Sequence, residues 1–342
     1  MASPQTSVNR ARAALIGVAL AVLVSAGTIV LAASLWFQHA VYGDRALPAV
    51  QTDVVVPRGS TFGQVVTLLD THRVLAHPLA FRLLARLRSV EADVQAGEYR
   101  FPAHQSSDEV LERLVRGEQY AVWVTIPEGF TAREIATTLA ARGLKPADDF
   151  ERVFLHEPLT VDGTRAPDLE GYLFPSTYLL PVDDSPEAIA DVLVGQFFQE
   201  LPPHAAARAR ALHVTVPQAV TVASLVEREG KVDDERPLIA SVIYNRLRRK
   251  MPLEIDASLE YAFPTHHDVI TARDLHVDSP YNTYRHVGLP PTPIANPGKP
   301  SLDAAFAPAT TDYLYYVAKG DGRHAFARTY AEHQANVARY LK

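Results

Sequence analysis

The chain has no cysteine and no surplus of positive charge, since its 342 residues hold 33 Lys and Arg against 39 Asp and Glu. Without cysteine there can be no disulfide bridge, thiolate zinc site or cysteine nucleophile. The net charge of −6 argues against nucleic acid as a partner, because phosphate neutralisation needs clustered Lys and Arg. The sequence also lacks a glycine-rich phosphate loop and a Gly-x-Ser-x-Gly elbow, so it indicates neither a bound nucleotide nor a serine nucleophile. We expect no cofactor.

Charge is also missing from one long segment, residues 13–37, which runs for 25 positions without a charged side chain. As a helix it would be about 37 Å long, enough to cross a hydrocarbon core of about 30 Å. Arg10 and Arg12 precede it and Trp36 lies at its far end, as in a membrane anchor whose amino terminus stays in the cytoplasm. We therefore predict a single pass through the cytoplasmic (inner) membrane, with residues 1–12 as a cytoplasmic tail and the rest of the chain outside. A cleaved signal peptide is the alternative, but its apolar region is usually shorter.

Residues 38–52 contain glycine and proline but few large apolar side chains, which is typical of a linker. An internal repeat follows, because Val56-Pro57-x-Gly59-x-Thr61 is matched 70 positions later by Ile126-Pro127-x-Gly129-x-Thr131. In each copy a β-branched run precedes the turn and a helical pattern follows it. Such strand-helix units resemble the LysM fold, which holds glycan chains, although a duplicated scaffold explains the pattern equally well. We predict a LysM-like region over residues 53–148.

From residue 149 onward the pattern changes to loops rich in Asp and Pro, helical periods and a tyrosine-rich core strand at residues 313–317. Helices and strands do not alternate regularly. The sequence therefore indicates an α+β fold class rather than a parallel doubly wound sheet. Residues 149–342 are expected to form a second domain of mixed helices and strands.

The clearest helix in that domain is predicted over residues 216–230. Thr215 and Gln218 have the spacing of a capping box, and a glycine supplies the stop. At 100° per residue Glu229 continues the apolar stripe of this helix, whereas Glu227 lies on another side and is expected to be solvated.

A carboxyl group in an apolar stripe is unusual. Burial disfavours the ionised form of Glu229, and so does the carbonyl end of the helix, where negative charge is unfavourable. The group should therefore keep its proton near neutral pH, as a general acid requires. The alternative is that Glu229 pairs with a buried arginine (Arg228, Arg236 or Arg246) or lies in a frayed, solvated last turn.

An ordered series of short motifs makes the sequence more specific. They occupy residues 169–175, 223–229, 235–236, 242–247, 251–256, 281–284, 288–291, 293–298, 313–317 and 324–326. With these motifs the chain resembles the YceG-like family over essentially all residues from 52 onward.

The resemblance implies an endolytic lytic transglycosylase that cuts the bond between N-acetylmuramic acid and N-acetylglucosamine in nascent peptidoglycan. The products would have 1,6-anhydro ends, and strand elongation would stop. In this family the second Glu of a Glu-x-Glu pair is the catalytic residue, which corresponds to Glu229, and residues 149–342 become the catalytic domain. The resemblance also suggests penicillin-binding synthases as partners. The expected substrate-binding residues are Asp256, Asn282, Tyr281, Tyr284 and Glu254.

Two other functions remain open at this stage. A non-catalytic, membrane-anchored adaptor that binds glycan for cell-wall synthases would use the same anchor and repeat, and a muramidase would hydrolyse the same bond. A metal site is not expected, because the candidate ligands lack the helix-spaced His pair of hydrolytic zinc sites; they are His266, His267, Asp268, His276, Asp278 and His286.

Overall fold

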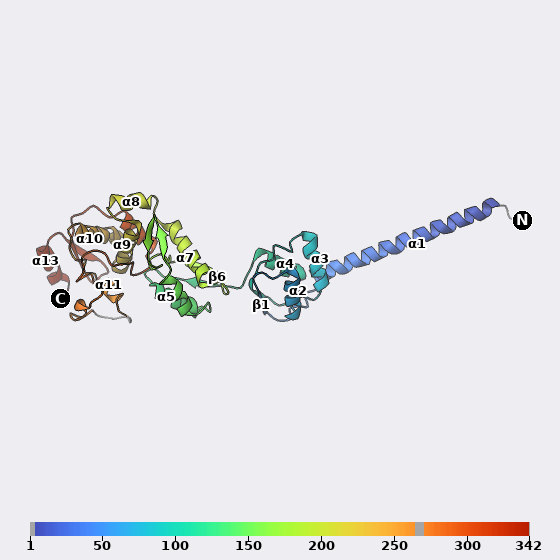
Figure 1. Ribbon diagram of the computed structural model, residues 1–342, viewed down its shortest axis with the longest axis horizontal. Helices are drawn as coiled ribbons and strands as arrows, with labels where there is room; N and C mark the ends of the chain where they lie inside the picture. Colours follow the sequence, from blue (N-terminus) through green and yellow to red (C-terminus); the bar gives the residue numbers. More distant parts are fainter. Residues whose placement is uncertain (1–3, 264–269, 342) are drawn as a thin grey trace. The chain divides into compact units, whose positions relative to one another are not determined.

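The computed structural model describes residues 4–263 and 270–341. The chain divides into two compact units, Met1–Ala121 and Val122–Lys342 (Figure 1). Both units combine helices with small two-stranded sheets, which confirms a mixed helix and sheet fold.

The first unit begins with a long helix and continues with a small sheet covered by three shorter helices. Its elements are α1 (Pro4–Gln38), the π-helical turn η1 (His39–Gly43), β1 (Thr52–Val56), α2 (Phe62–Thr71), α3 (Pro78–Arg88), β2 (Gly97–Phe101) and α4 (Ser107–Arg116). Strands β1 and β2 pair antiparallel, with Thr52 opposite Phe101. Helices α2 and α4 both begin with a complete capping box, at Thr61 and Ser106.

Helix α1 is longer than the predicted anchor, because it begins at Pro4 and its helical course continues through η1 to Gly43. Within Gly17–Gly43 an 18-residue window has a mean hydropathy of 2.4, and none of that window is buried against the rest of the protein. This helix is therefore long and apolar enough to cross a membrane, which is consistent with single-pass anchoring.

The segment expected to be a free linker differs from that expectation. Ala40 and Val41, within residues 38–52, are 1% and 0% exposed and belong to the core of the first unit together with Phe81 and Tyr99. Small apolar side chains suffice here because the helical turn η1 brings them against α3 and α4.

The second unit holds the remaining strands and nine α-helices among the described residues. Its elements are β3 (Ala121–Thr125), α5 (Ala132–Ala141), α6 (Ala147–Phe154), β4 (Leu159–Val161), β5 (Thr164–Ala166), β6 (Thr177–Pro181), α7 (Pro186–Glu200), α8 (Ala205–Ala211), α9 (Val216–Glu229), η2 (Asp233–Glu235), α10 (Arg236–Arg248), α11 (Asp256–Glu260), η3 (Asp274–His276), α12 (Lys299–Phe306), β7 (Tyr315–Ala318), β8 (His324–Ala327) and α13 (Tyr330–Tyr340).

The boundary between the units lies at residues 121/122 and not at the expected 148/149. The second copy of the repeat supplies β3, α5 and α6, and β3 pairs with β6, far downstream in the sequence. Val124 and Ile126 consequently pack into the same core as Val220 of α9. The two copies of the repeat are thus parts of different units.

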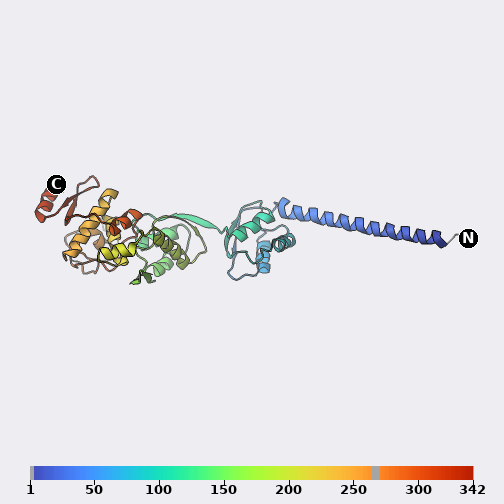
Figure 2. The same cartoon turned by 90° about the horizontal axis from the view of Figure 1, so that it is seen from above.

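Helix α9 lies within this core and packs against α10 and α12. Figure 1 labels α9 next to α10, and Figure 2 shows the same ribbon from above. Thr215 and Gln218 form the predicted capping box. The helix is buried along most of its length, from Val216 to Val226, and ends at Glu229, with Gly230 as the cap residue. The fold therefore fixes one end of α9 by its cap and presents the last turn to a loop-rich surface.

Candidate active site

Glu229 is the last residue of α9 and is partly buried. Its Oε2 accepts a hydrogen bond of 3.1 Å from the hydroxyl of Tyr316 on β7. Burial raises the pKa of Glu229 to about 7, the hydrogen bond from Tyr316 lowers it, and the negative charges of Asp256 and Glu260 raise it. The carboxyl group therefore retains a proton around neutral pH.

The position of Tyr316 depends on a second buried carboxylate. Glu235 is 5% exposed and accepts hydrogen bonds from the backbone N–H of His324, at 2.9 Å, and from its ring Nδ1, also at 2.9 Å. The His324 ring meets the ring of Tyr316 edge-on, with centroids 5.3 Å apart. Glu235 thus holds the β7–β8 hairpin in the position that lets Tyr316 reach Glu229.

Two of the expected substrate-binding residues lie beside this carboxyl group. Asp256 is the first residue of α11, and its Oδ1 accepts a short hydrogen bond from the hydroxyl of Tyr284. Burial is the main reason that the pKa of Tyr284 is raised, and the charges of Asp256 and Glu229 add to the effect. The structure therefore brings Glu229, Asp256 and Tyr284 into one electrostatic cluster.

Glu254 lies at the edge of the same cluster, where its charge also raises the pKa of Tyr284. Its Oε2 is 2.9 Å from Nη1 of Arg246, and its side chain is about half exposed. Arg246 in turn donates to the backbone carbonyl groups of Leu253 and Leu314. This arginine joins the loop that carries Glu254 to the strand that carries Tyr316.

Asn282 and Tyr281 do not present free polar groups to a substrate. Asn282 is 0% exposed; its amide nitrogen donates to the carbonyl groups of Leu275 and Val277, and its Oδ1 accepts from the N–H of Tyr284. The Tyr281 hydroxyl bonds Thr292, and its ring packs against Tyr261. These contacts favour a role for both residues in shaping the loop.

The prediction of a solvated Glu227 was wrong. Its side chain is 6% exposed, lies 3.3 Å from Nη1 of Arg236 and accepts the N–H of Gly298 at 3.0 Å. Loop residues after Pro293 fold over this face of α9, which a helical wheel alone does not reveal.

Glu229 forms no ion pair with any residue that the structure describes, so the alternative of a buried arginine partner does not apply. The neighbouring Arg228 pairs instead with Glu260 at 3.3 Å and donates to the carbonyl of Gly129. Arg236 is engaged by Glu227, and Arg246 by Glu254. The proposed acid therefore remains available for proton transfer.

A cavity of about 720 Å³ adjoins the end of α9. Arg228, which precedes Glu229 in the sequence, lines it together with Glu260, and so do Thr131 and Glu134 at the start of α5. Tyr261 also lines the cavity. The second copy of the repeat thus provides part of the lining of the cavity at the end of α9.

In contact with this lining is a buried carboxyl that the sequence analysis did not select. Glu170 is 0% exposed, accepts the N–H of Ala132 at 3.0 Å and the hydroxyl of Tyr261 at 3.0 Å, and accepts Nδ2 of Asn296 at 3.0 Å. Burial raises the pKa of Glu170 to about 8. Its motif, residues 169–175, was recognisable, but the hydrogen-bond partners of Glu170 lie in three distant segments.

Tyr316 was likewise assigned only to a core strand, because nothing local in the sequence links it to Glu229.

Among the described residues there is no group of three His, Cys, Asp or Glu side chains that could hold a metal ion. His266, His267 and Asp268 lie outside the described residues.

A carboxyl group whose pKa is raised to about 7, at the end of a helix where the preceding residue lines a cavity, is suited to acid–base chemistry. The chain belongs to the YceG-like family, whose model matches residues 54–339.

Three relatives illustrate the match. An endolytic murein transglycosylase of Bacillus subtilis (strain 168) is 33% identical over 327 residues, covering 88% of this chain and 89% of that protein. The endolytic murein transglycosylase of Streptococcus pneumoniae serotype 2 is 31% identical, covering 84% of this chain and 58% of that protein. A crystal structure of a yceG-like protein from Listeria monocytogenes matches with a TM-score of 0.55 and 30% identity, covering 83% of this chain and 98% of that one.

Proposed function

We propose that the protein is an endolytic lytic transglycosylase that cleaves the bond between N-acetylmuramic acid and N-acetylglucosamine in nascent peptidoglycan. The observation that carries the proposal is Glu229, a carboxyl without an ion-pair partner in the described residues, whose pKa is raised to about 7 at the end of α9 where Arg228 lines a cavity. The names of the curated relatives support the same activity.

In the first step Glu229 gives its proton to the glycosidic oxygen, and the bond from that oxygen to the anomeric carbon of the muramic acid breaks. The charges of Asp256 and Glu260, which already act on Glu229, favour the positive charge that develops on the sugar ring. The hydroxyl of Tyr316 stabilises the Glu229 anion that is left.

In the second step the muramic acid's own 6-hydroxyl oxygen bonds to the anomeric carbon, and Glu229 takes up the hydroxyl proton. The product is a 1,6-anhydro ring, and the carboxyl returns to its starting state. A single carboxyl suffices, because the nucleophile belongs to the substrate and no water needs activation.

The two copies of the repeat are the proposed glycan-holding parts. In the first unit, the turn after β1 and the loop before β2 line a cavity of about 320 Å³, and the order strand, helix, helix, strand is the one expected of a LysM-like unit. Thr61 and Gln64 line a further cavity there, and their counterparts 70 positions later, Thr131 and Glu134, line the cavity at the end of α9. Equivalent positions in both copies thus face open space.

For location, we propose the cytoplasmic (inner) membrane, with residues 1–12 in the cytoplasm and the chain after residue 37 outside. The apolar part of α1 and the arginines before it support this orientation. Penicillin-binding synthases are the proposed partners, since they produce the strands that this activity would cut.

The test is Glu229→Gln in the full chain, with purified glycan strands as substrate and mass spectrometry of the cut ends. An exposed carboxylate of the first unit, Glu112, gives the matched control Glu112→Gln. Loss of the general acid should lower the cleavage rate by at least about 100-fold while strand binding persists. The control should cleave normally.

Two outcomes would contradict the proposal. Unchanged product formation by Glu229→Gln would show that Glu229 is not the general acid, and no cleavage by the unaltered chain would favour the glycan-binding adaptor. Reducing ends that are heavier by one water than anhydro ends would identify a muramidase.

A further inference from the structure

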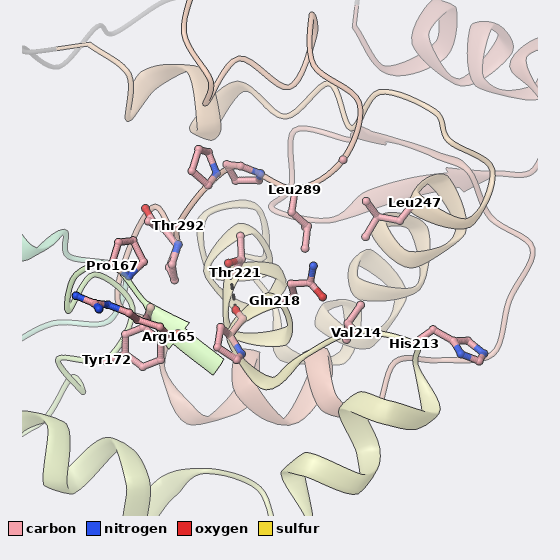
Figure 3. Close-up of a pocket in the computed structure, with 16 residues that line it drawn as sticks. Arg165, Pro167, Tyr172, His213, Val214, Gln218, Thr221, Leu247, Leu289 and Thr292 are labelled. Carbon is pink, nitrogen blue, oxygen red and sulfur yellow. Dashed lines mark hydrogen bonds between the residues drawn. The ribbon is translucent and has the colours of Figure 1, made fainter. Parts of the chain in front are cut away.

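A second cavity, of about 380 Å³, lies at the opposite end of α9 from Glu229. Figure 3 shows Gln218 and Thr221 of α9 in its wall, with Arg165 and Tyr172 on one side and His213 on the other. Residues 288–293 close it from above α9 as drawn. Nothing in the reaction proposed for Glu229 uses this space.

The polar groups in its wall are mainly hydrogen-bond donors. Arg165 is exposed and has no ion-pair partner within the described part of the chain, and no Asp or Glu is among the described residues of the lining. Asp168 is close to Arg165 in sequence but does not line the cavity, and its Oδ1 accepts the N–H of Glu170. Gln218 uses its Oε1 for the N–H of Thr215, which leaves its NH₂ group for a ligand.

Tyr172 adds a donor whose bonding capacity is unused. Its side chain is 0% exposed, and its hydroxyl has no hydrogen-bond partner in the described ranges. A buried hydroxyl without a partner is destabilising, so an oxygen atom placed in the cavity would relieve that cost. The wall therefore suits a ligand that carries acceptors and negative charge.

The rest of the wall is apolar and rigid. It is formed by proline rings and aliphatic side chains: Pro167, Pro217, Pro290, Leu247 and Leu289. Such a surface accommodates methyl groups but lacks the carboxylates that usually bind sugar hydroxyls. A peptide with free carboxylates and small apolar side chains fits better than a neutral sugar.

Peptidoglycan carries such a peptide on each muramic acid, as a stem rich in alanine with free carboxylates. Gln218 and Glu229 are eleven positions apart in α9, which is about 16 Å along the helix. A stem of about four residues reaches up to about 14 Å when extended, before the lactyl group that joins it to the sugar is added. The loop that holds Tyr284 against Asp256 continues directly into residues 288–293 of the cavity.

We propose that this cavity binds the acidic stem peptide of the strand whose glycan lies at Glu229, with Arg165 and Tyr172 as specificity-determining residues. The proposal rests on the proposed function for its substrate. It makes the protein selective for strands that still carry stems over strands from which they have been removed.

The experiment compares Arg165→Gln and Tyr172→Phe with Arg142→Gln, a matched control at an exposed residue after α5 that lines neither cavity. Each full-length chain is assayed on stem-bearing strands and on the same strands after an amidase has removed the stems. Binding of a free, fluorescently labelled tetrapeptide stem is measured separately by anisotropy. Tyr172→Phe should not lower the melting temperature, because the lost hydroxyl has no protein partner.

For the unaltered chain and the control, we expect a KM about tenfold lower on stem-bearing strands, the effect of one or two charge-assisted hydrogen bonds. Arg165→Gln and Tyr172→Phe should reduce this difference with kcat and the KM for stripped strands unchanged, and both should weaken binding of the free peptide.

Equal KM values on the two substrates together with no binding of the free peptide would overturn the inference, while cleavage itself would leave the proposed function standing. A rise in KM on both substrates in Arg165→Gln would show that the cavity binds sugar, and would also overturn it. If no strand is cleaved but the free peptide binds through Arg165, the proposed function fails and the peptide site remains.

Discussion

Tyr316→Phe tests the electrostatic account of Glu229, because it removes one hydroxyl and leaves the ring in place. That hydroxyl donates to Oε2 of Glu229 at 3.1 Å and holds down a pKa that burial raises to about 7. A hydrogen bond to a charged group contributes about 1.5–3 kcal/mol, and about 1.4 kcal/mol corresponds to one pH unit. Water reaches part of the Glu229 side chain and would replace part of the lost hydrogen-bond energy, so we expect the pKa of Glu229 to rise by about one pH unit.

The sign of the effect on activity follows from the first step, which needs protonated Glu229. Activity of the unaltered chain should fall as the pH rises through about 7. In Tyr316→Phe this alkaline fall should occur at higher pH, and the rate at low pH should decrease, because the Glu229 anion is less stabilised. The measurement is the pH profile of kcat for release of anhydro ends from purified strands.

Tyr313→Phe is the matched control, since Tyr313 lies next to the same strand but its hydroxyl has no contact with Glu229. Its profile should match that of the unaltered chain. An alkaline limb that stays in place in Tyr316→Phe, or moves to lower pH, would refute the role given to this hydrogen bond.

Three further predictions concern stability. Glu229→Gln should raise the melting temperature more at pH 8 than at pH 5. The carboxyl, with a pKa raised to about 7, binds more protons in the folded than in the unfolded state, so the unaltered chain loses stability as the pH rises toward that value. An equal gain in melting temperature at both pH values would contradict this. Arg236→Met should lower the free energy of unfolding, measured in urea, by about 3–5 kcal/mol, since it leaves the buried Glu227 without its ion-pair partner. Asn282→Ala should lower the free energy of unfolding by about 1–3 kcal/mol through loss of its loop hydrogen bonds, with little change in the KM of the folded enzyme. A raised KM with unchanged stability would instead identify Asn282 as a sugar-binding residue.

Local patterns predicted what depends on local structure. The capping box at Thr215 and the apolar stripe of α9 were sufficient to find the helix and to select Glu229 on it. They could not predict the surroundings of the carboxyl, because Tyr316 lies 87 positions away. For the same reason Glu227 was predicted to be solvated, because Gly298, which donates a hydrogen bond to it, lies in a loop 71 positions downstream.

The predicted domain boundary at 148/149 differs from the observed one at 121/122 for the same physical reason. The repeat is visible in the sequence, but only the pairing of β3 with β6 decides to which unit its second copy belongs. Of the five substrate-binding residues expected from family resemblance, Asp256, Tyr284 and Glu254 lie in the cluster around Glu229, and Asn282 and Tyr281 support the loop beneath it. Residue type alone does not distinguish an amide that meets a sugar from one that closes a turn.

The incorporation of the second repeat into the larger unit restricts how this protein can be divided. Glu170 and Asn296 bind the beginning of α5 from within the core, so a fragment cut at residue 149 would lose β3 and α5 and expose their contacts. A copy of the repeat that is built into another core is not an exchangeable module. Domain swaps between relatives should therefore be made near residue 121, where the first copy can be replaced without opening the core that carries Glu229.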